Sequence, residues 1–146
     1  MLFRSGVTTT QIAALTTDQV PAFAASQIAS LSTAQLLALE TADLTALLPV
    51  QVAALKSTQI AVLNSTQMGA LLPGQVAAIS TVALLGVLTS QIQALTEVQI
   101  PALLPGQLRV LGSLQLRALE TSDVQDRKST RLNSSHTDIS RMPSSA

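Results

Sequence analysis

The sequence predicts an all-α solenoid built from short helices, with one helix for each eight-residue unit. Three observations predict it. The chain keeps an unbroken eight-residue register, each unit carries a helix-start signal at the same place, and the apolar positions of each unit lie three residues apart. Repeats of this kind cannot bury an apolar face alone, so they are expected to stack on their neighbours and share one continuous core.

The register begins at Thr8 and runs without insertion to Gln125. Its consensus is [S/T]-[T/P]-x-Q-[I/V/L]-x-A-L, and we number the columns one to eight from the Ser or Thr. In the complete units, column four is Gln except at Asp43 and Ala83. Columns five and eight are apolar in every complete unit, and column seven is small or Val. The strict register indicates a structural repeat.

Columns one to four carry the chemistry that begins a helix. A Ser or Thr followed three residues later by Gln forms a capping box, in which each side chain bonds the other's backbone N–H. Thr8 with Gln11, and Thr16 with Gln19, fit this pattern. Proline is tolerated at the first helical position, because its missing N–H has no partner there. Column two supplies it at Pro49, Pro73 and Pro105.

Columns five and eight predict that each helix buries one face against its neighbours. Residues three apart share a helical face, whereas a strand would require alternation. A single long helix is excluded, since eight residues overshoot two turns by roughly 80° and the apolar stripe would wind around it. Column-six prolines (Pro21 and Pro101) would also interrupt it.

Two features fit this prediction less well, and a β-solenoid is the alternative. Leu is a poor helix cap, yet it occupies column one in several units, where we interpret it as an additional core residue. Pro73-Gly74 and Pro105-Gly106 also suit a type II turn. The column-one leucines are Leu48, Leu72, Leu88 and Leu104.

The register divides the chain into a lead-in at residues 1–7, the repeat solenoid at 8–125 and a tail at 126–146. The lead-in lacks the long apolar core of a signal peptide. The tail, Asp126 to Ala146, has a different composition and resembles the translation of a sequencing-library adapter. DRKSTRLNSSH and SRMPSSA carry that resemblance. We interpret the tail as foreign and disordered; a natural Ser-rich terminus is the alternative.

The residue types present argue against catalysis and against a cofactor. The chain has no Cys, and its one His, His136, lies in the tail. The repeats therefore lack the usual general base and the thiol nucleophile. A Ser/Lys site would depend on Lys56, the one Lys outside the tail. We predict that the chain is not an enzyme and has no catalytic residues and no cofactor.

Charge and spacing argue against a metal site and against nucleic acid. Asp18, Glu40 and Asp43 fall in different columns and do not cluster as hard-cation ligands do. Of eight basic and eight acidic residues, four and two lie in the tail, which leaves four basic and six acidic residues and no basic patch. No Gly-rich phosphate loop and no membrane-spanning apolar run occurs.

The column-four Gln array has two interpretations. The first is capping together with hydrogen bonds between neighbouring turns. The second is a regular polar face that binds a ligand, a glycan or ice. Ice binding is the weaker interpretation, because the Thr residues that would suit an ice-binding face occupy cap positions. Met68, in column five, is expected to be a core residue rather than a haem ligand.

The run TTTQIAALTTDQV resembles the T-T-x-Q-[I/V]-x-A-L octapeptide tracts of large repetitive bacterial proteins, over Thr8 to Gln125. Such proteins are often labelled adhesion or haem-utilisation proteins, which implies the cell surface or secretion. Haem binding would need an axial ligand, and the repeats contain no His, Cys or Tyr. LPGQVAAI (Leu72 to Ile79) also looks like the opening of the repeats of transcription-activator-like effectors, but their second helix and base-reading loop are missing.

We therefore expect a non-catalytic spacer or stalk segment of a larger bacterial surface or secreted protein. Its first partners are the neighbouring repeats of the same chain, and uncapped ends are expected to self-associate. The alternative is a module that presents a solenoid face to a protein or glycan. Arg109 and Arg117, one repeat apart in column six, would form its small exposed patch.

Overall fold

The computed structural model describes residues 7–120, and it confirms the predicted all-α solenoid of short helices. No strand occurs between residues 7 and 120, so the β-solenoid alternative is not realised. The predicted foreign tail, Asp126 to Ala146, lies outside the described residues. The elements are α1 (Thr9–Ala13), η1 (Val20–Ala22), α2 (Ala25–Ser30), α3 (Thr33–Leu37), α4 (Thr41–Ala46), α5 (Pro49–Ala53), α6 (Ser57–Val62), α7 (Ser65–Ala70), α8 (Pro73–Ala78), α9 (Thr81–Leu84), α10 (Thr89–Gln93), η2 (Ile100–Ala102) and α11 (Pro105–Val110). Residues 113–120 are also helical.

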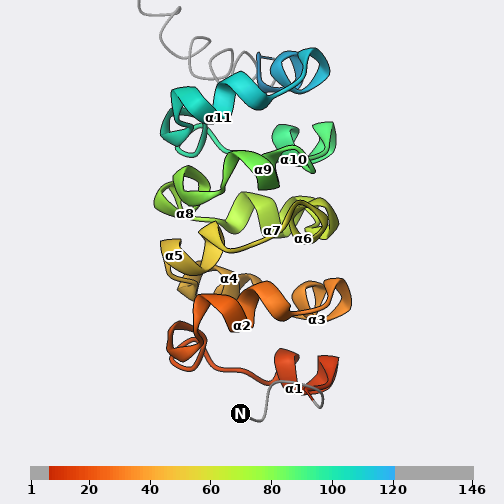
Figure 1. Cartoon of the computed structure of the whole chain (residues 1–146), viewed down its shortest axis with the longest axis vertical. Helices are drawn as coiled ribbons and strands as arrows, with labels where there is room; N and C mark the ends of the chain where they lie inside the picture. The colour runs from red at the N-terminus through yellow and green to blue at the C-terminus, as the bar shows by residue number, and fades with distance from the viewer. Residues whose placement is uncertain (1–6, 121–146) are drawn as a thin grey trace, which may run out of the picture.

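Three octads make one turn of the solenoid, because each helix packs on the helix three units away. One side of the coil stacks α1, α3, α6, α9 and α11, and a second stacks η1, α4, α7 and α10. The third side stacks α2, α5, α8 and η2. The tiers rise from the N-terminal end along the long axis of the molecule (Figure 1). One turn therefore spans 24 residues.

Local sequence explains the form of each unit. Pro49, Pro73 and Pro105 each open a helix, as predicted. Both units that form a 3-10 helix, η1 and η2, carry Pro in column six, where it removes the N–H that an α-helical bond would need. Helices this short are unstable alone, so their stability comes from stacking.

At the ends of the units, one expectation is wrong and one alternative is not realised. The column-one leucines are not core residues, because they are about half exposed: Leu48 44%, Leu72 51%, Leu88 52% and Leu104 51%. Column one precedes the helix in extended backbone and points away from the stacked interior. The Pro-Gly pairs form no type II turn; each opens a helix, and no described glycine has a positive φ.

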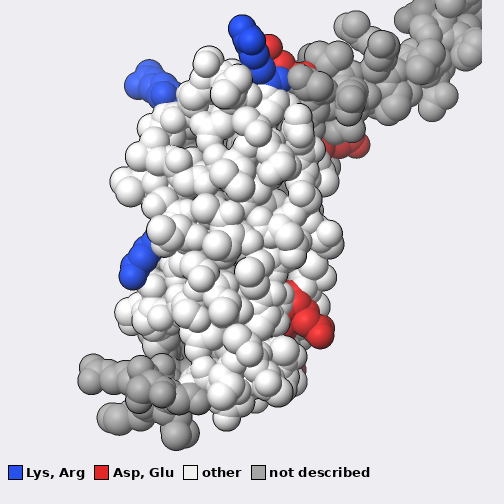
Figure 2. All heavy atoms as spheres, turned by 90° about the vertical axis from the view of Figure 1, so that its right-hand side faces the viewer, with Lys and Arg blue, Asp and Glu red and all other residues white. Residues whose placement is uncertain are grey.

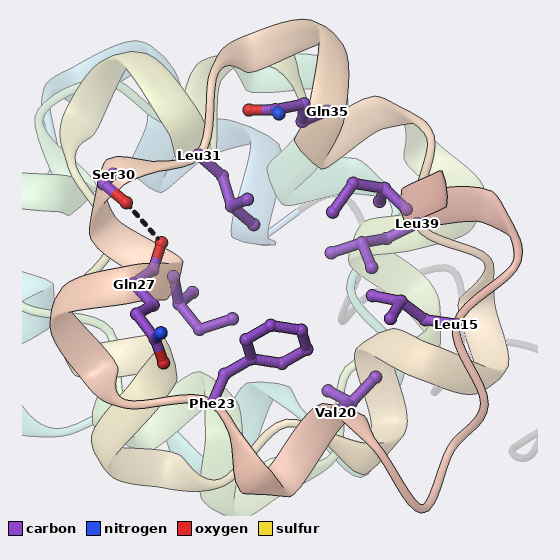
Figure 3. Close-up of a pocket in the computed structure, with 10 residues that line it drawn as sticks. Leu15, Val20, Phe23, Gln27, Ser30, Leu31, Gln35 and Leu39 are labelled. Atoms are coloured by element: carbon purple, nitrogen blue, oxygen red, sulfur yellow. Dashed lines mark hydrogen bonds between the residues drawn. The ribbon is translucent and has the colours of Figure 1, made fainter. Parts of the chain in front are cut away.

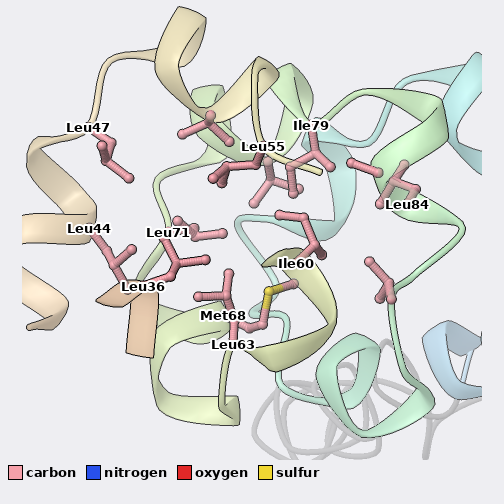
Figure 4. Packing of buried hydrophobic residues seen from close by; sticks show 14 of the residues in the cluster. Leu36, Leu44, Leu47, Leu55, Ile60, Leu63, Met68, Leu71, Ile79 and Leu84 are labelled. Carbon is pink, nitrogen blue, oxygen red and sulfur yellow. The ribbon is translucent and has the colours of Figure 1, made fainter. Parts of the chain in front are cut away.

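Columns five and eight form the core, as predicted. Column five is buried from Ile12 to Ile92, and column eight from Leu39 to Leu111. Met68 is 1% exposed and lies among apolar side chains, as expected for a core residue (Figure 4). The stacked turns thus share one apolar interior along the molecule.

The two columns pack in opposite directions along the axis. In the first turn column five is buried, but the column-eight residues Leu15, Phe23 and Leu31 are only half-buried. In the last described turn the pattern is reversed: Leu103 and Leu111 are buried, whereas Leu108 and Leu116 are exposed. Column five therefore packs on the following turn, and column eight on the preceding turn.

Candidate functional site

The Gln of column four is the repeated polar feature of the molecule, and the structure buries it. Its exposed fraction is 3% or less in the inner units, at Gln51, Gln59, Gln67, Gln75, Gln91, Gln99 and Gln107. A buried amide needs partners for both its oxygen and its nitrogen. Each of these Gln side chains has both.

The amide oxygen of each Gln serves its own helix. In Gln75 the Oε1 accepts the backbone N–H of Leu72, at 2.7 Å, and the same bond recurs in the other units. The other half of the capping box depends on the column-one side chain, which accepts the backbone N–H of the column-four residue. Thr8, Ser32 and Ser80 accept it through a hydroxyl oxygen, and Asn64 through its amide oxygen. At Thr16 only the Gln19 half forms, so the predicted box is incomplete there.

The amide nitrogen serves the preceding turn. The Nε2 of Gln75 donates to the carbonyls of Leu44 at 2.8 Å, Thr45 at 3.2 Å and Leu47 at 2.6 Å. These lie 28 to 31 residues earlier and end a helix whose last carbonyls have no partner within it. Equivalent bonds form from Gln51, Gln59, Gln67, Gln91, Gln99 and Gln107. We call these bonds the inter-turn Gln bonds.

The inter-turn Gln bonds decide between the two interpretations of the array. One side chain closes the start of its own helix and the end of a helix one turn below. A buried side chain whose oxygen and nitrogen are both bonded to backbone offers no regular polar face to a ligand or to ice. The array is a structural element between turns.

The two exceptions in column four leave gaps in these bonds. Ala83 is buried, and Gly86 in the same unit lies tightly against α6: a Cβ at Gly86 would come within 2.3 Å of the Ser57 carbonyl oxygen. Two small residues thus bring α9 close to α6. At Asp43 the gap is polar, because its Oδ2 is buried and bonds no partner.

The candidate metal ligands do not converge on one site. Asp18 and Glu40 are exposed, whereas Asp43 is 3% exposed. Between residues 7 and 120, no group of three or more His, Cys, Asp or Glu side chains could hold a metal ion. Lys56 is exposed at column one of its unit. His136 lies outside the described residues.

Charged side chains are few among residues 7–120. Figure 2 shows one side of the coil, where basic and acidic groups occupy the margins and ends and the area between them is uncharged. Arg109 lies in α11 and Arg117 in the helical stretch 113–120, and consecutive units belong to different sides of the coil. The two arginines therefore do not stack as one column.

Hollows among the described residues include one inside the first turn and one between two turns. At the N-terminal end, a cavity of about 20 Å³, roughly one water, lies inside the first turn, with Leu15, Val20, Phe23, Leu31 and Leu39 pointing into it (Figure 3). An open groove of about 620 Å³ runs between the turns containing α4 and α7. Its lining includes Glu40, Thr41, Asn64, Ser65 and Thr66.

The fold and these contacts define an all-α solenoid of octapeptide repeats whose turns are joined by a buried Gln column. Residues 36–73 match the ALTTAQ repeat family. The matched segment spans α4 to α7 and includes Gln51, Gln59 and Gln67. No curated protein and no solved structure matches the chain. No described helix is long and apolar enough to cross a membrane.

Proposed function

We propose that the repeat region is a non-catalytic structural segment that acts as a spacer or stalk in a larger bacterial surface or secreted protein. One observation carries the proposal: where the column-four Gln is buried, as in Gln51 to Gln75 and Gln91 to Gln107, both its amide oxygen and its amide nitrogen are used in internal bonds. What repeats outside is small, hydroxylated or apolar, with no recurrent anchor such as Trp, Tyr or Arg.

The packing supports a spacer role, because the segment can gain length when units are added. Each unit contacts its equivalent one turn before and one turn after, so added units lengthen the rod without altering the existing contacts. Stacked helices lie about 8–10 Å apart, so each 24-residue turn adds about that much length. A spacer needs no reactive group, which agrees with the proposed absence of enzymatic activity.

Deleting repeats by whole and partial turns tests the spacer proposal. Residues 48–71 form one turn of three units, and residues 48–55 form one unit. With spin labels at Thr17 and Thr96, removing 48–71 should shorten the distance by about 8–10 Å and keep the label directions. Removing 48–55 should instead rotate one label by about a third of a turn. A collapsed or unfolded 24-residue deletion contradicts a modular rod.

The ends of the described coil support self-association. Half-buried Leu15, Phe23 and Leu31 at one end are the column-eight face, and exposed Leu108 and Leu116 at the other are the column-five face. Inside the molecule these two faces pack on each other. We therefore expect end-to-end association, measured by light scattering as a mass that grows with concentration. A monomer at high concentration would refute it.

The binding-module alternative is favoured by the groove between α4 and α7. Glu40, Asn64 and Thr66 place a carboxylate, an amide and a hydroxyl along an open channel, and a glycan could bond such groups. A glycan array separates the alternatives. Specific capture lost in both Glu40→Gln and Asn64→Ala, but kept in the distant control Thr96→Ala, would favour the module over the spacer.

A further inference from the structure

Asp43 is the one described buried side chain with an unbonded polar atom. It lies in α4, is 3% exposed, and its Oδ2 has no hydrogen-bond partner. Its carboxylate accepts the backbone N–H of Glu40, the residue three before it. Asp43 therefore reproduces the bond that Gln Oε1 makes in other units, but not the bonds made by Nε2.

The register identifies the carbonyls that a column-four donor would reach from this position. Inter-turn Gln bonds reach carbonyls 28 and 31 residues earlier, for example from Gln75 to Leu47 and Leu44. Counted from Asp43, these are Leu15 and Ile12 in the first turn. No described residue donates to the carbonyl oxygen of Leu15. An ionised carboxylate cannot donate to it, whereas a protonated carboxyl group can.

We propose that Asp43 is a proton-dependent joint between the first and second turns of the solenoid. When protonated, its Oδ2–H donates to the carbonyl of Leu15, in place of a Gln amide. When it is ionised, that bond is absent and a buried negative charge faces carbonyl oxygens. Asp is one methylene shorter than Gln, so forming the bond draws the first turn toward α4. The inference is independent of the spacer role.

The surroundings favour the neutral carboxyl group. Burial raises the pKa of Asp43, and the nearby Glu40 charge raises it further, while the hydrogen bond from the Glu40 backbone lowers it. The elements packed against α4 are η1 and α7. The unit of α7 carries no ionisable side chain, and neither does that of α1; the unit of η1 carries only Asp18, another acid. No cation from these units opposes the rise in the pKa.

The sign of the pH dependence follows from the raised pKa. The folded pKa lies above the unfolded value of about 3.8, so the folded state holds the proton more tightly. Stability of the joint is lowest above the folded pKa and rises as the pH falls toward 3.8. Across this range the opening equilibrium of the first turn changes about tenfold for each pH unit by which folding raises the pKa of Asp43.

Hydrogen exchange on the full chain, followed from about pH 7 to about pH 4 and corrected for intrinsic rates, tests the proposal. We expect protection of residues 8–31 to rise in the wild type as the pH falls, by about tenfold for each pH unit by which folding raises the pKa of Asp43. In the Asp43→Asn variant the first turn should be protected at all pH values, because the Asn amide supplies the hydrogen-bond donor without a charge. The control Asp18→Asn should keep the wild-type pH dependence.

The Asp43→Leu variant removes the charge without adding a hydrogen-bond donor, so it distinguishes these two effects of Asp43→Asn. If Asp43→Asn and Asp43→Leu protect the first turn equally, or if Asp43→Asn keeps the wild-type pH dependence, the proposal is wrong. Should Asp43→Asn not fold, carbon NMR of the wild type decides. The Leu15 carbonyl resonance should follow the titration of the Asp43 carboxyl group, and an unresponsive Leu15 carbonyl would overturn the proposal.

Discussion

The units of η1 and η2 have almost the same sequence pattern, TTDQVPAF and TEVQIPAL, and fold alike into a 3-10 helix. In both, the Gln oxygen accepts the N–H of the column-one Thr. Yet Gln19 is exposed, and Gln99 is completely buried. The Nε2 of Gln99 donates to Met68, Gly69 and Leu71, whereas that of Gln19 bonds no described residue.

The difference comes from the turn below and not from the unit itself. Gln99 has the helix end of α7 beneath it, and Gln19 belongs to the first described turn. The same side chain is therefore a local cap at one place and a link between turns at another. Single substitutions at matched positions in the inner and outer turns can test whether capping and linkage contribute separately to stability.

The largest effect is expected in column five, where Leu44 is fully buried between two turns and Leu108 is 36% exposed. Leu44→Ala should lower the free energy of unfolding by about 4 kcal/mol, since it leaves a cavity in a closed core. Leu108→Ala, with no covering turn among the described residues, should cost about 2 kcal/mol. Urea unfolding measures both, and equal losses would contradict the directional packing.

The second-largest effect on stability is expected for the pair Gln99 and Gln19. Gln99→Ala removes the cap bond and three carbonyl bonds and leaves buried carbonyls unpaired, so we expect a loss of about 3 kcal/mol. Gln19→Ala removes one exposed bond and should cost about 1 kcal/mol or less. The same urea experiment applies. A Gln19→Ala loss as large as that of Gln99→Ala would show that capping, not linkage, dominates.

Two glycines extend the comparison to contacts between turns. Gly86→Ala would place a Cβ against the Ser57 carbonyl, so the backbones must separate, at about 2 kcal/mol. Gly74 has open space around its Cβ position, and Gly74→Ala should stabilise the protein by roughly 0.5 kcal/mol. Thermal unfolding should therefore move in opposite directions for the two. A neutral Gly86→Ala would mean that α9 and α6 are less tightly packed.

The smallest effect concerns column one. Leu72 is half exposed and offers no side-chain cap to the N–H of Gln75, which the Leu72 backbone carbonyl accepts, whereas the Ser32 hydroxyl accepts the N–H of Gln35. Leu72→Ser should raise the free energy of unfolding by about 0.5–1 kcal/mol. Leu72→Ala is the control, because it removes the Leu without adding a hydroxyl. A destabilised Leu72→Ser would restore a packing role for the column-one leucines.

Much of this fold follows from local sequence. The register, the opening prolines and the apolar columns predicted one short helix per unit and its buried face, because these signals act within eight residues. The three-unit turn was not predictable, since it depends on how successive helices bend back over 24 residues. The inter-turn Gln bonds depend on that turn, because their acceptors lie about 28 residues away. The burial that leaves the Oδ2 of Asp43 without a partner depends on it too.

The wrong expectation for the column-one leucines has the same origin. Leucine is apolar, and the sequence alone does not show that column one lies in extended backbone directed away from the axis. For Leu48 and Leu72, the backbone geometry of the cap overrides the preference of the side chain for the interior. Within the Gln column the reverse holds, since a polar residue is buried because its bonds are complete.

Exchange of the Gln side-chain amide protons, measured by NMR, shows whether the Gln column links the turns. If the Gln column links the turns, the Nε2 protons of Gln51, Gln75 and Gln99 exchange slowly, because they are buried and bonded to carbonyls of the preceding turn. Those of the exposed Gln11 and Gln19 then exchange at the rate of a free amide. Fast exchange at every Gln would contradict the account.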